Sequence, residues 1–351
     1  MRHCNDLLLV LFLAAAAAPL CAQQPSSAPA QTPPPLTVDR DPVRSPEGDL
    51  PAAAAAPQLH KQGEGYILHT YVEEVVLNAT VLDGSKLVPD LKKENFQVYE
   101  DGVRQTIISF QHADVPVSIA LVVDNSGSMS RKRPAVNKSA LDLIEASNPQ
   151  DEAFVVNFSD EAFIDQDFTS DTNKLREGLS MMESKGGTAL YDAVEASADK
   201  LASDAKHPKQ VLILITDGED NASSYNLEQT IRRVQSLSGP VIYTIGLLYG
   251  DDMTRGEVRS ARRALEALST ETGGMAFFPK SIEQIDQIAA EVARDIRNQY
   301  MLGYHSTKPT SEPGFRRVTV VAQGSGGKLT ARTRTGYYPG TRVGNSAPEQ
   351  K

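Results

Sequence analysis

Nearly continuous apolar runs alternate with amphipathic segments through the middle of the chain. The runs occupy residues 117–123, 153–158, 211–215 and 241–247. Strands buried on both faces of a parallel sheet have this composition. Helical patterns lie between and after them, at 134–147, 171–183, 188–204, 226–237 and 257–270. Strands that alternate with helices predict a doubly wound, mostly parallel α/β sheet, to which 162–168 adds an antiparallel edge strand and 275–278 a short strand.

A long amphipathic helix is expected to end this α/β region. It starts at Ser281, with Glu283 and Gln284 in its first turn, so we expect Ser281 to cap it. Its apolar stripe is formed by Ile285, Ile288, Ala289, Val292 and Ile296.

The segments on either side of the α/β region have a strand pattern instead. Residues 63–114 and 300–340 alternate apolar and polar positions between turn signals such as Asp83-Gly84 and Asp101-Gly102. The simplest interpretation is one small β-sandwich, built from both segments, with the α/β domain of 115–299 inserted between its halves. Two separate β lobes are the alternative, although a lobe of two or three strands is barely stable.

The start of the chain is typical of an exported protein. Residues 1–22 combine the positive Arg2, an apolar stretch at 7–20 and a small-residue cleavage site after Ala22, which predicts a signal peptide. Lipid anchoring through Cys21 is the alternative, but Leu20 stands where a small residue is normal. The expected location is the periplasm, the cell surface or the exterior. Residues 23–62 are rich in Pro and Ala and predict a disordered tether, and 341–351 predict a disordered tail.

Composition narrows the classes of function. The formal net charge of −10 repels phosphate backbones and argues against nucleic acid as a partner. No long apolar run follows the N-terminus, so no transmembrane segment is expected in the mature chain. The only cysteines are Cys4 and Cys21, which excludes disulfides, thiolate metal sites and a cysteine nucleophile from a mature chain that is cleaved after Ala22.

Polar residues with oxygen donors stand at the ends of the predicted strands. Asp124, Ser126 and Ser128 form an Asp-x-Ser-x-Ser motif directly after the first strand, Asp217 follows the third, and Thr188 opens a helix. Ligands bind at the carboxyl ends of such strands. Carboxylates and hydroxyls are hard ligands, suited to Mg²⁺, Mn²⁺ or Ca²⁺ rather than zinc. We expect Gly127 to let the backbone turn between the ligands.

The Asp-x-Ser-x-Ser motif, Thr188 and Asp217, in this order along the chain, resemble the von Willebrand factor type A (VWA) domain and its metal ion-dependent adhesion site (MIDAS). The resemblance covers about residues 115–300 and fills every position of the motif. Segments such as Phe96–Gly102 and Leu302-Gly303-Tyr304 are also similar to bacterial exported proteins called VWFA-related domain proteins. The resemblance implies that Ser126, Ser128 and Thr188 ligate Mg²⁺, or Mn²⁺ or Ca²⁺, and that Asp124 and Asp217 act directly or through water.

The resemblance further implies a binding function rather than an enzyme. The open coordination position of the metal would accept an Asp or Glu carboxylate from a partner protein. A structural envelope protein, in which the metal only stabilises the domain, is one alternative, and a metal-dependent hydrolase is another. The hydrolase lacks a visible general base, because the six histidines lie outside the motifs and no Gly-x-Ser-x-Gly elbow is present. Helix capping by the aspartates and a site that no longer binds metal are the remaining interpretations.

Several residues near the motifs could be functional but also fit an ordinary structural role. Asp251 and Asp252 could share the rim of the sheet but fit a solvated loop. Arg131, Lys132 and Arg133 could attract an acidic partner but fit a solvated helix start equally well. Tyr191 could pack under the loop that begins at Asp217, although core packing is the usual role of an aromatic residue at such a position.

Overall fold

The computed structural model describes residues 59–62, 65–68, 74–145, 148–180, 186–237, 239–249, 253–324 and 326–340, the first two ranges by their backbone alone. The predicted signal peptide, Asp251 and Asp252, the tail and nearly all of the tether lie outside these residues. Leu59–Gln62 (β1), at the end of the predicted tether, is a strand that pairs with Gly65–Leu68 (β2). Among the described residues, no helix is long and apolar enough to cross a membrane.

The α/β region contains one six-stranded sheet with the predicted doubly wound arrangement. Its order is β10 (Ala162–Thr169), β9 (Glu152–Phe158), β8 (Val117–Asp124), β11 (Lys209–Thr216), β12 (Val241–Gly246) and β13 (Ala276–Phe277). Only the edge strand β10 runs antiparallel. The order of strands reverses between β8 and β11, and this is the place where such sheets bind ligands.

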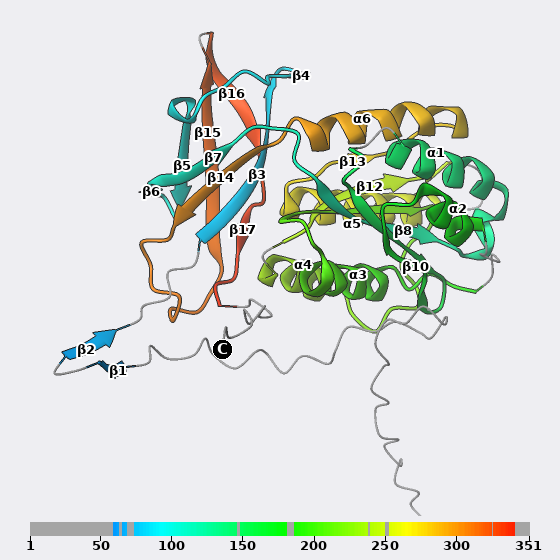
Figure 1. Ribbon diagram of the computed structural model, residues 1–351. Coiled ribbons are helices and arrows are strands. Elements are labelled where there is room, and N and C mark those ends of the chain that lie inside the picture. The colour runs from blue at the N-terminus through cyan, green and yellow to red at the C-terminus, as the bar shows by residue number, and fades with distance from the viewer. Residues whose placement is uncertain are drawn as a thin grey trace, which may run out of the picture. The chain divides into compact units, whose positions relative to one another are not determined.

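Helices cover both faces of this sheet (Figure 1). On one face lie α1 (Arg133–Glu145), α2 (Thr172–Ser180) and α6 (Ile285–Arg297), and on the other α3 (Leu190–Asp204), α4 (Leu227–Ser236) and α5 (Arg255–Thr272). Leu121 and Val123 of β8 join the first core, whereas Ala120 and Val122 join the second. Because both faces are buried, β8 is apolar at nearly every position.

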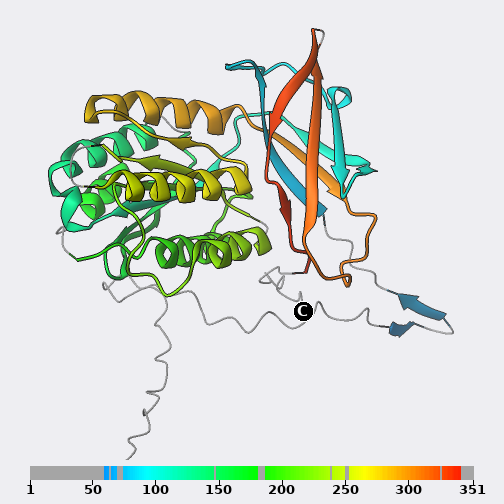
Figure 2. The same ribbon diagram turned by 180° about the vertical axis from the view of Figure 1, so that it is seen from behind.

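Strands from before and after the α/β region pair with one another in a second sheet, the β lobe. These strands are β3 (Glu74–Asp83), β4 (Lys86–Leu87), β5 (Phe96–Glu100), β6 (Val103–Gln105), β7 (Ile107–Gln111), β14 (Tyr300–His305), β15 (Arg316–Gly324), β16 (Gly327–Arg332) and β17 (Gly336–Tyr337). The late strands β14 and β16 both pair with the early strand β3, and β15 pairs with β5 (Figures 1 and 2). Alternate residues of these strands form a separate apolar core.

A buried carboxylate joins α6 to the β lobe. Asp295 is 4% exposed, and its Oδ2 accepts hydrogen bonds from the Tyr243 hydroxyl at 2.5 Å and the Thr80 hydroxyl at 3.4 Å. Arg332 of β16 forms an ion pair with the same oxygen. Thr80 lies in β3, so Asp295 contacts strands from both ends of the chain.

The predicted cap of the last helix is wrong. The α-helix begins at Ile285, after a 3-10 turn at Ile282–Gln284, and the Ser281 side chain caps no backbone group. The Ser281 hydroxyl instead hydrogen-bonds the Glu283 carboxylate and lowers the pKa of that group. Gln284 Oε1 accepts the Lys280 N–H at 2.8 Å, so its side chain also serves the preceding loop.

Glu195 of α3 makes the stability of the α/β domain depend on pH. Burial raises the pKa of this carboxyl from 4.5 to about 7, with a smaller contribution from Asp199 and an opposing hydrogen bond from Thr230. Because the folded pKa is the higher one, the associated stability is fully present below pH 4.5 and is lost as pH rises through about 7. The expected loss at alkaline pH is at most about 3 kcal/mol.

Glu195→Gln is therefore expected to be more stable than the parent chain above pH 7, because glutamine keeps the acceptor for Thr230 without a buried charge. Denaturant unfolding at several pH values between 5 and 9 measures the effect. Glu228→Gln, at an exposed position of α4, is the matched control. An unchanged dependence of stability on pH in Glu195→Gln would contradict the assignment.

Candidate metal centre

Asp124, the last residue of β8, anchors the first loop of the candidate site. Its side chain is buried, and its Oδ1 accepts the backbone N–H of Ser126 at 2.8 Å. Its Oδ2 accepts the Thr216 hydroxyl at 2.5 Å, which ties the loop to the neighbouring strand β11. Burial raises the pKa of Asp124, while these hydrogen bonds oppose that shift. Both oxygens therefore accept hydrogen bonds from the protein, one from the loop and one from β11, an arrangement that suits a carboxylate acting on a metal through water.

Three further oxygens of the predicted set lie next to one another. Ser126 Oγ is 3.1 Å from Ser128 Oγ, and Ser128 Oγ donates to Asp217 Oδ1 at 2.8 Å. Neighbouring ligands around an octahedral Mg²⁺ are about 3 Å apart, since each lies about 2.1 Å from the ion. The spacing and the chemistry of these side chains therefore fit a small, hard divalent cation.

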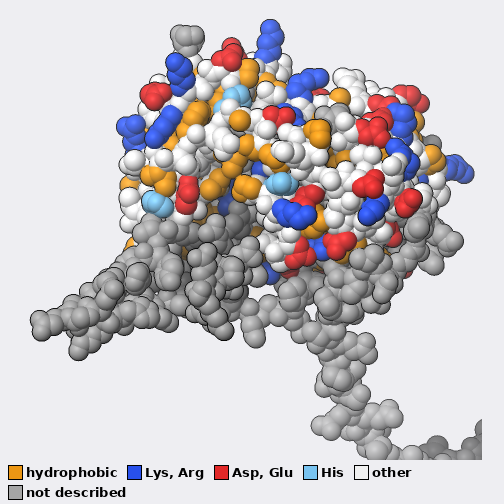
Figure 3. Space-filling model, in the orientation of Figure 1, with side chains coloured by type: hydrophobic (Ala, Val, Ile, Leu, Met, Phe, Trp, Pro, Cys, Tyr) orange, Lys and Arg blue, Asp and Glu red, His pale blue; other side chains and the backbone are white. Residues whose placement is uncertain are grey.

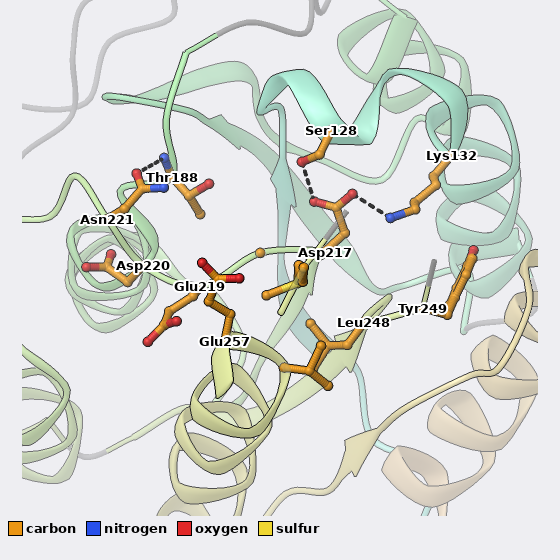
Figure 4. Close-up of a pocket in the computed structure, with 13 residues that line it drawn as sticks. Ser128, Lys132, Thr188, Asp217, Glu219, Asp220, Asn221, Leu248, Tyr249 and Glu257 are labelled. Carbon is orange, nitrogen blue, oxygen red and sulfur yellow. Dashed lines mark hydrogen bonds and ion pairs between the residues drawn. The ribbon is translucent and has the colours of Figure 1, made fainter. Parts of the chain in front are cut away.

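Thr188 lies two residues before the start of α3 and is close to the same oxygen cluster. Its N–H donates to Asn221 Oδ1 at 2.9 Å, and its carbonyl accepts the Asn221 N–H at 3.0 Å. Its hydroxyl faces the third loop, residues 217–220 after β11, because a Cβ built on Gly218 would lie 3.4 Å from Thr188 Oγ1. Figure 4 shows Thr188, Ser128 and Asp217 around one cavity. The structure thus brings all five predicted residues to the carboxyl edge of β8 and β11.

Glycine is required in the second loop, which precedes Thr188, and not in the first loop after Asp124. Gly186 has φ +85°, and a Cβ there would collide with the Asp160 carboxylate. The neighbouring Gly187 donates its N–H to Asp160 Oδ1 at 2.7 Å. The expectation for Gly127 is wrong, because its φ is not positive and a Cβ there would contact nothing within 4 Å. The first loop turns instead by a 3-10 helix at Gly127–Arg131.

A buried polar network supports the first loop from below. Asn125 Nδ2 donates to Asn157 Oδ1 at 3.2 Å, Arg133 donates to Asn125 Oδ1, and Asn157 donates to Asp165. Arg133 is 7% exposed, so its interpretation as part of a solvated helix start is wrong. Nothing in the sequence pattern separates this arginine from the exposed Arg131 two residues before it.

Lys132 also points inward, to the candidate site. Its Nζ lies 2.6 Å from Asp217 Oδ2 and 3.4 Å from the Leu247 carbonyl, and 5.2 Å from the centroid of the Tyr249 ring (Figure 4). Only 14% of the Lys132 side chain is exposed, against 0% for that of Asp217. The expectation of a solvated lysine is therefore wrong. Sequence reasoning missed its role because the motif gives no direction for the side chains that follow it.

A cavity of about 270 Å³ adjoins the oxygen cluster. Ser128, Thr188, Asp217 and Lys132 line part of it, and the rest of its wall is made of apolar, acidic and other polar residues. The wall consists of Gly218, Glu219, Asp220, Asn221, Leu248, Tyr249, Met253, Glu257 and Val258. The cavity is open to a side chain from outside and offers it both apolar and charged surroundings.

The Asp220 side chain holds the third loop against the start of α3. Asp220 Oδ1 accepts the Leu190 N–H at 2.9 Å and also binds Ser223. Burial, with Asp220 and Glu219 nearby, raises the pKa of Tyr191 to about 12. Tyr191 thus lies beside the third loop and also packs against the core of this face. Within the described residues, no three His, Cys, Asp or Glu side chains are placed to hold a metal ion among themselves.

The comparison with protein families identifies the domain that carries this site. A family model described as von Willebrand factor type A domain matches residues 119–219, a range that includes all five predicted residues. Mouse calcium-activated chloride channel regulator 3A-1 is 31% identical over 169 residues, which are 46% of this chain and 17% of the relative. Human inter-alpha-trypsin inhibitor heavy chain H4 is 25% identical over 178 residues, 46% of this chain and 18% of the relative.

A wider but more distant match is an uncharacterized Synechocystis protein, 21% identical over 221 residues, 60% of this chain and 52% of the relative. The chain therefore spans about half or less of the length of these curated relatives. Neither of the two named relatives is described as an enzyme.

Two solved structures are similar at low identity. A von Willebrand factor type A protein from Catenulispora acidiphila has a TM-score of 0.45 and 14% identity, over 78% of this chain and 75% of that one. Proximal thread matrix protein 1 from the mussel byssus, described with a zinc-occupied MIDAS motif, has a TM-score of 0.43 and 18% identity, over 56% and 49%. Together, the family match over 119–219 and the curated relatives show that this chain contains a von Willebrand factor type A domain.

Proposed function

We propose that Asp124, Ser126, Ser128, Thr188 and Asp217 bind a divalent cation, and that the site binds a carboxylate of a partner protein. The observation that carries the proposal is the contact of Ser126, Ser128 and Asp217 oxygens at 2.8–3.1 Å beside an open cavity. Mg²⁺ suits these ligands best, with Mn²⁺ and Ca²⁺ as the alternatives.

Each side chain has a distinct task in this proposal. Ser126, Ser128 and Thr188 supply neutral hydroxyl oxygens, and Asp217 adds one charged oxygen that already hydrogen-bonds Ser128. Asp124 keeps the first loop closed through its bonds to Ser126 and Thr216. A bound divalent cation would supply a Lewis-acidic position for one more oxygen ligand. Few charged ligands leave such an ion attractive to a carboxylate from another protein.

The remaining surface favours a protein as the partner. On the face that Figure 3 shows, acidic and basic side chains are interspersed and form no continuous basic surface of the kind that nucleic acid requires. The cavity wall includes Leu248, Met253 and Val258, which can contact the apolar part of a peptide beside its carboxylate. We also propose that the protein is exported and that its β lobe is a sandwich that supports the VWA domain.

Binding to a carboxylate with and without chelator tests the proposal. A panel of fluorescent peptides, each with one Asp or Glu, is titrated with the protein in Mg²⁺, in Mn²⁺, in Ca²⁺ and in EDTA. At least one acidic peptide is expected to bind in Mg²⁺, and its Asn or Gln counterpart is expected not to bind. EDTA is expected to abolish the binding, because the metal makes the contact.

The other interpretations predict different results in the same titrations. Melting that depends on Mg²⁺, with no acidic peptide bound, would support a purely structural metal. Turnover of a phosphoester substrate would support a hydrolase. Melting and binding that EDTA leaves unchanged would refute the metal site.

A further inference from the structure

Asp217 faces two groups at once, one with each carboxylate oxygen. Its Oδ1 accepts from the Ser128 hydroxyl at 2.8 Å, on the side of the other candidate metal ligands. Its Oδ2 contacts the Lys132 ammonium at 2.6 Å. Figure 4 shows this chain of contacts from Ser128 through Asp217 to Lys132. A cation bound at the hydroxyls would share this carboxylate with the ammonium.

The ammonium is fixed in this place by more than one contact. Besides Asp217, it reaches the Leu247 carbonyl at 3.4 Å, at the end of β12, and lies 5.2 Å from the centroid of the Tyr249 ring. The stem of Lys132 is mostly buried, with 14% of the side chain exposed. An ion pair enclosed in this way is screened less by solvent than a pair at the surface.

A divalent cation at the hydroxyls would lie only about 5 Å from the ammonium, given metal–oxygen distances of about 2.1 Å. The two positive charges repel at that distance. Even with the dielectric constant of water, this repulsion weakens the binding of a divalent cation by about tenfold. Without the metal, the same ammonium compensates the buried charge of Asp217, whose side chain is 0% exposed.

We propose that Lys132 is an internal counter-ion of the metal site, which stabilises Asp217 in the metal-free protein and weakens the binding of the divalent cation. The inference rests on the metal-binding part of the proposed function. Lys132 acts through Asp217 and is a positioning residue rather than a ligand. Its repulsion raises the concentration of the divalent cation that is needed to fill the site.

Metal titration of Lys132→Met tests the proposal. Methionine keeps the length of the stem and removes the charge, so the Kd for Mg²⁺, measured by calorimetry, is expected to fall by about tenfold or more. Lys132→Arg keeps the charge and is expected to bind Mg²⁺ as the parent chain does. Lys138→Met is the matched control. It removes the same charge from an exposed side chain of α1 that pairs with Asp142 and Asp286, away from the candidate site, and it should leave the Kd unchanged.

Thermal melting separates this role from a merely structural one. In EDTA, Lys132→Met is expected to melt below the parent chain, because Asp217 loses its counter-ion. In saturating Mg²⁺ most of that loss should be recovered, so the shift in melting temperature caused by Mg²⁺ is larger in the variant. A structural role alone would lower both melting temperatures equally.

The possible outcomes distinguish this inference from the proposed function. If the parent chain binds Mg²⁺ and Lys132→Met binds it equally or more weakly, the counter-ion role is wrong and the metal site stands. If the parent chain binds no divalent cation under any condition, the metal site and the counter-ion role both fail. Tighter Mg²⁺ binding in Lys132→Met and Lys132→Arg alike would also refute the inference, since charge would then not be the cause.

Discussion

Asp217→Ala is expected to abolish binding of Mg²⁺ and of any carboxylate ligand, with a loss of affinity of at least about 100-fold. Changes to residues that merely orient metal ligands cost about 10–100-fold, and Asp217 is proposed as part of the site itself. Its carboxylate is the link between Ser128 and Lys132, at 2.8 and 2.6 Å. The substitution removes a charged oxygen and leaves the positive ammonium beside the hydroxyls.

The measurement is Mg²⁺ titration together with the melting temperature in Mg²⁺ and in EDTA. The parent chain is expected to melt higher in Mg²⁺, and Asp217→Ala is expected to melt at one temperature in both. Asp142→Ala, which removes an exposed aspartate of α1, controls for the change in net charge. Far-ultraviolet circular dichroism establishes that the variant is folded. A folded Asp217→Ala protein that binds Mg²⁺ normally would show that the candidate site is misassigned.

Asp295→Ala is expected to destabilise the protein by about 3–5 kcal/mol, the usual effect of removing one partner from a buried ion pair. Arg332 would lose its carboxylate, and the Tyr243 hydroxyl and the Thr80 hydroxyl would lose their common acceptor. The contacts join α6 to β3 and β16, so unfolding of the β lobe and of the VWA domain should become less cooperative. Denaturant unfolding, followed by several spectroscopic probes, measures both effects.

Two further variants make the result specific. Glu291→Ala removes an exposed carboxylate from the same helix and should change the stability by less than about 0.5 kcal/mol. Asp295→Asn keeps an acceptor oxygen in place and should fall between the parent chain and Asp295→Ala. Equal stability of Asp295→Ala and Glu291→Ala would show that the buried cluster does not join the two regions.

The main elements of the fold could be predicted because buried strands and helix faces have a recognisable pattern of apolar residues. Strand β8 is buried on both faces, and its nearly continuous apolar run predicted both its existence and its end at Asp124. Helix α6 followed its predicted stripe, including the buried Ile285, Val292 and Ile296. The ends of elements were less predictable. The first turn of the last helix depends on whether the Ser281 hydroxyl bonds to a backbone group or to a neighbouring side chain, and hydrophobic pattern carries no information on that choice.

In the candidate site, too, some residues could be identified from the sequence pattern and others depended on tertiary packing. Asp124, Ser126, Ser128 and Asp217 could be grouped as candidates because they follow strands whose ends meet at one edge of the sheet. Thr188 stands before a helix instead, and it was grouped with them through the resemblance to the VWA motif. Lys132 and Arg133 could not be assigned, because adjacent helix-start residues point in different directions and their partners, Asp217 and Asn125, are set by tertiary packing. Asp295 was one more polar position in an amphipathic helix. Its burial depends on β3 and β16, which are remote in sequence.

The pairing of β14 with β7 bears on the order in which the chain is expected to fold. Met301 lies opposite Gln111, so the two strands are neighbours only after the chain between them has returned to its starting point. If that chain were still disordered, closing a loop of about 190 residues would cost roughly 4–5 kcal/mol in entropy. A folded VWA domain removes this cost, because its first and last elements already bring both ends together. Its folding is therefore expected to precede closure of the β lobe, and closure should be less favourable on a chain whose central domain is misfolded.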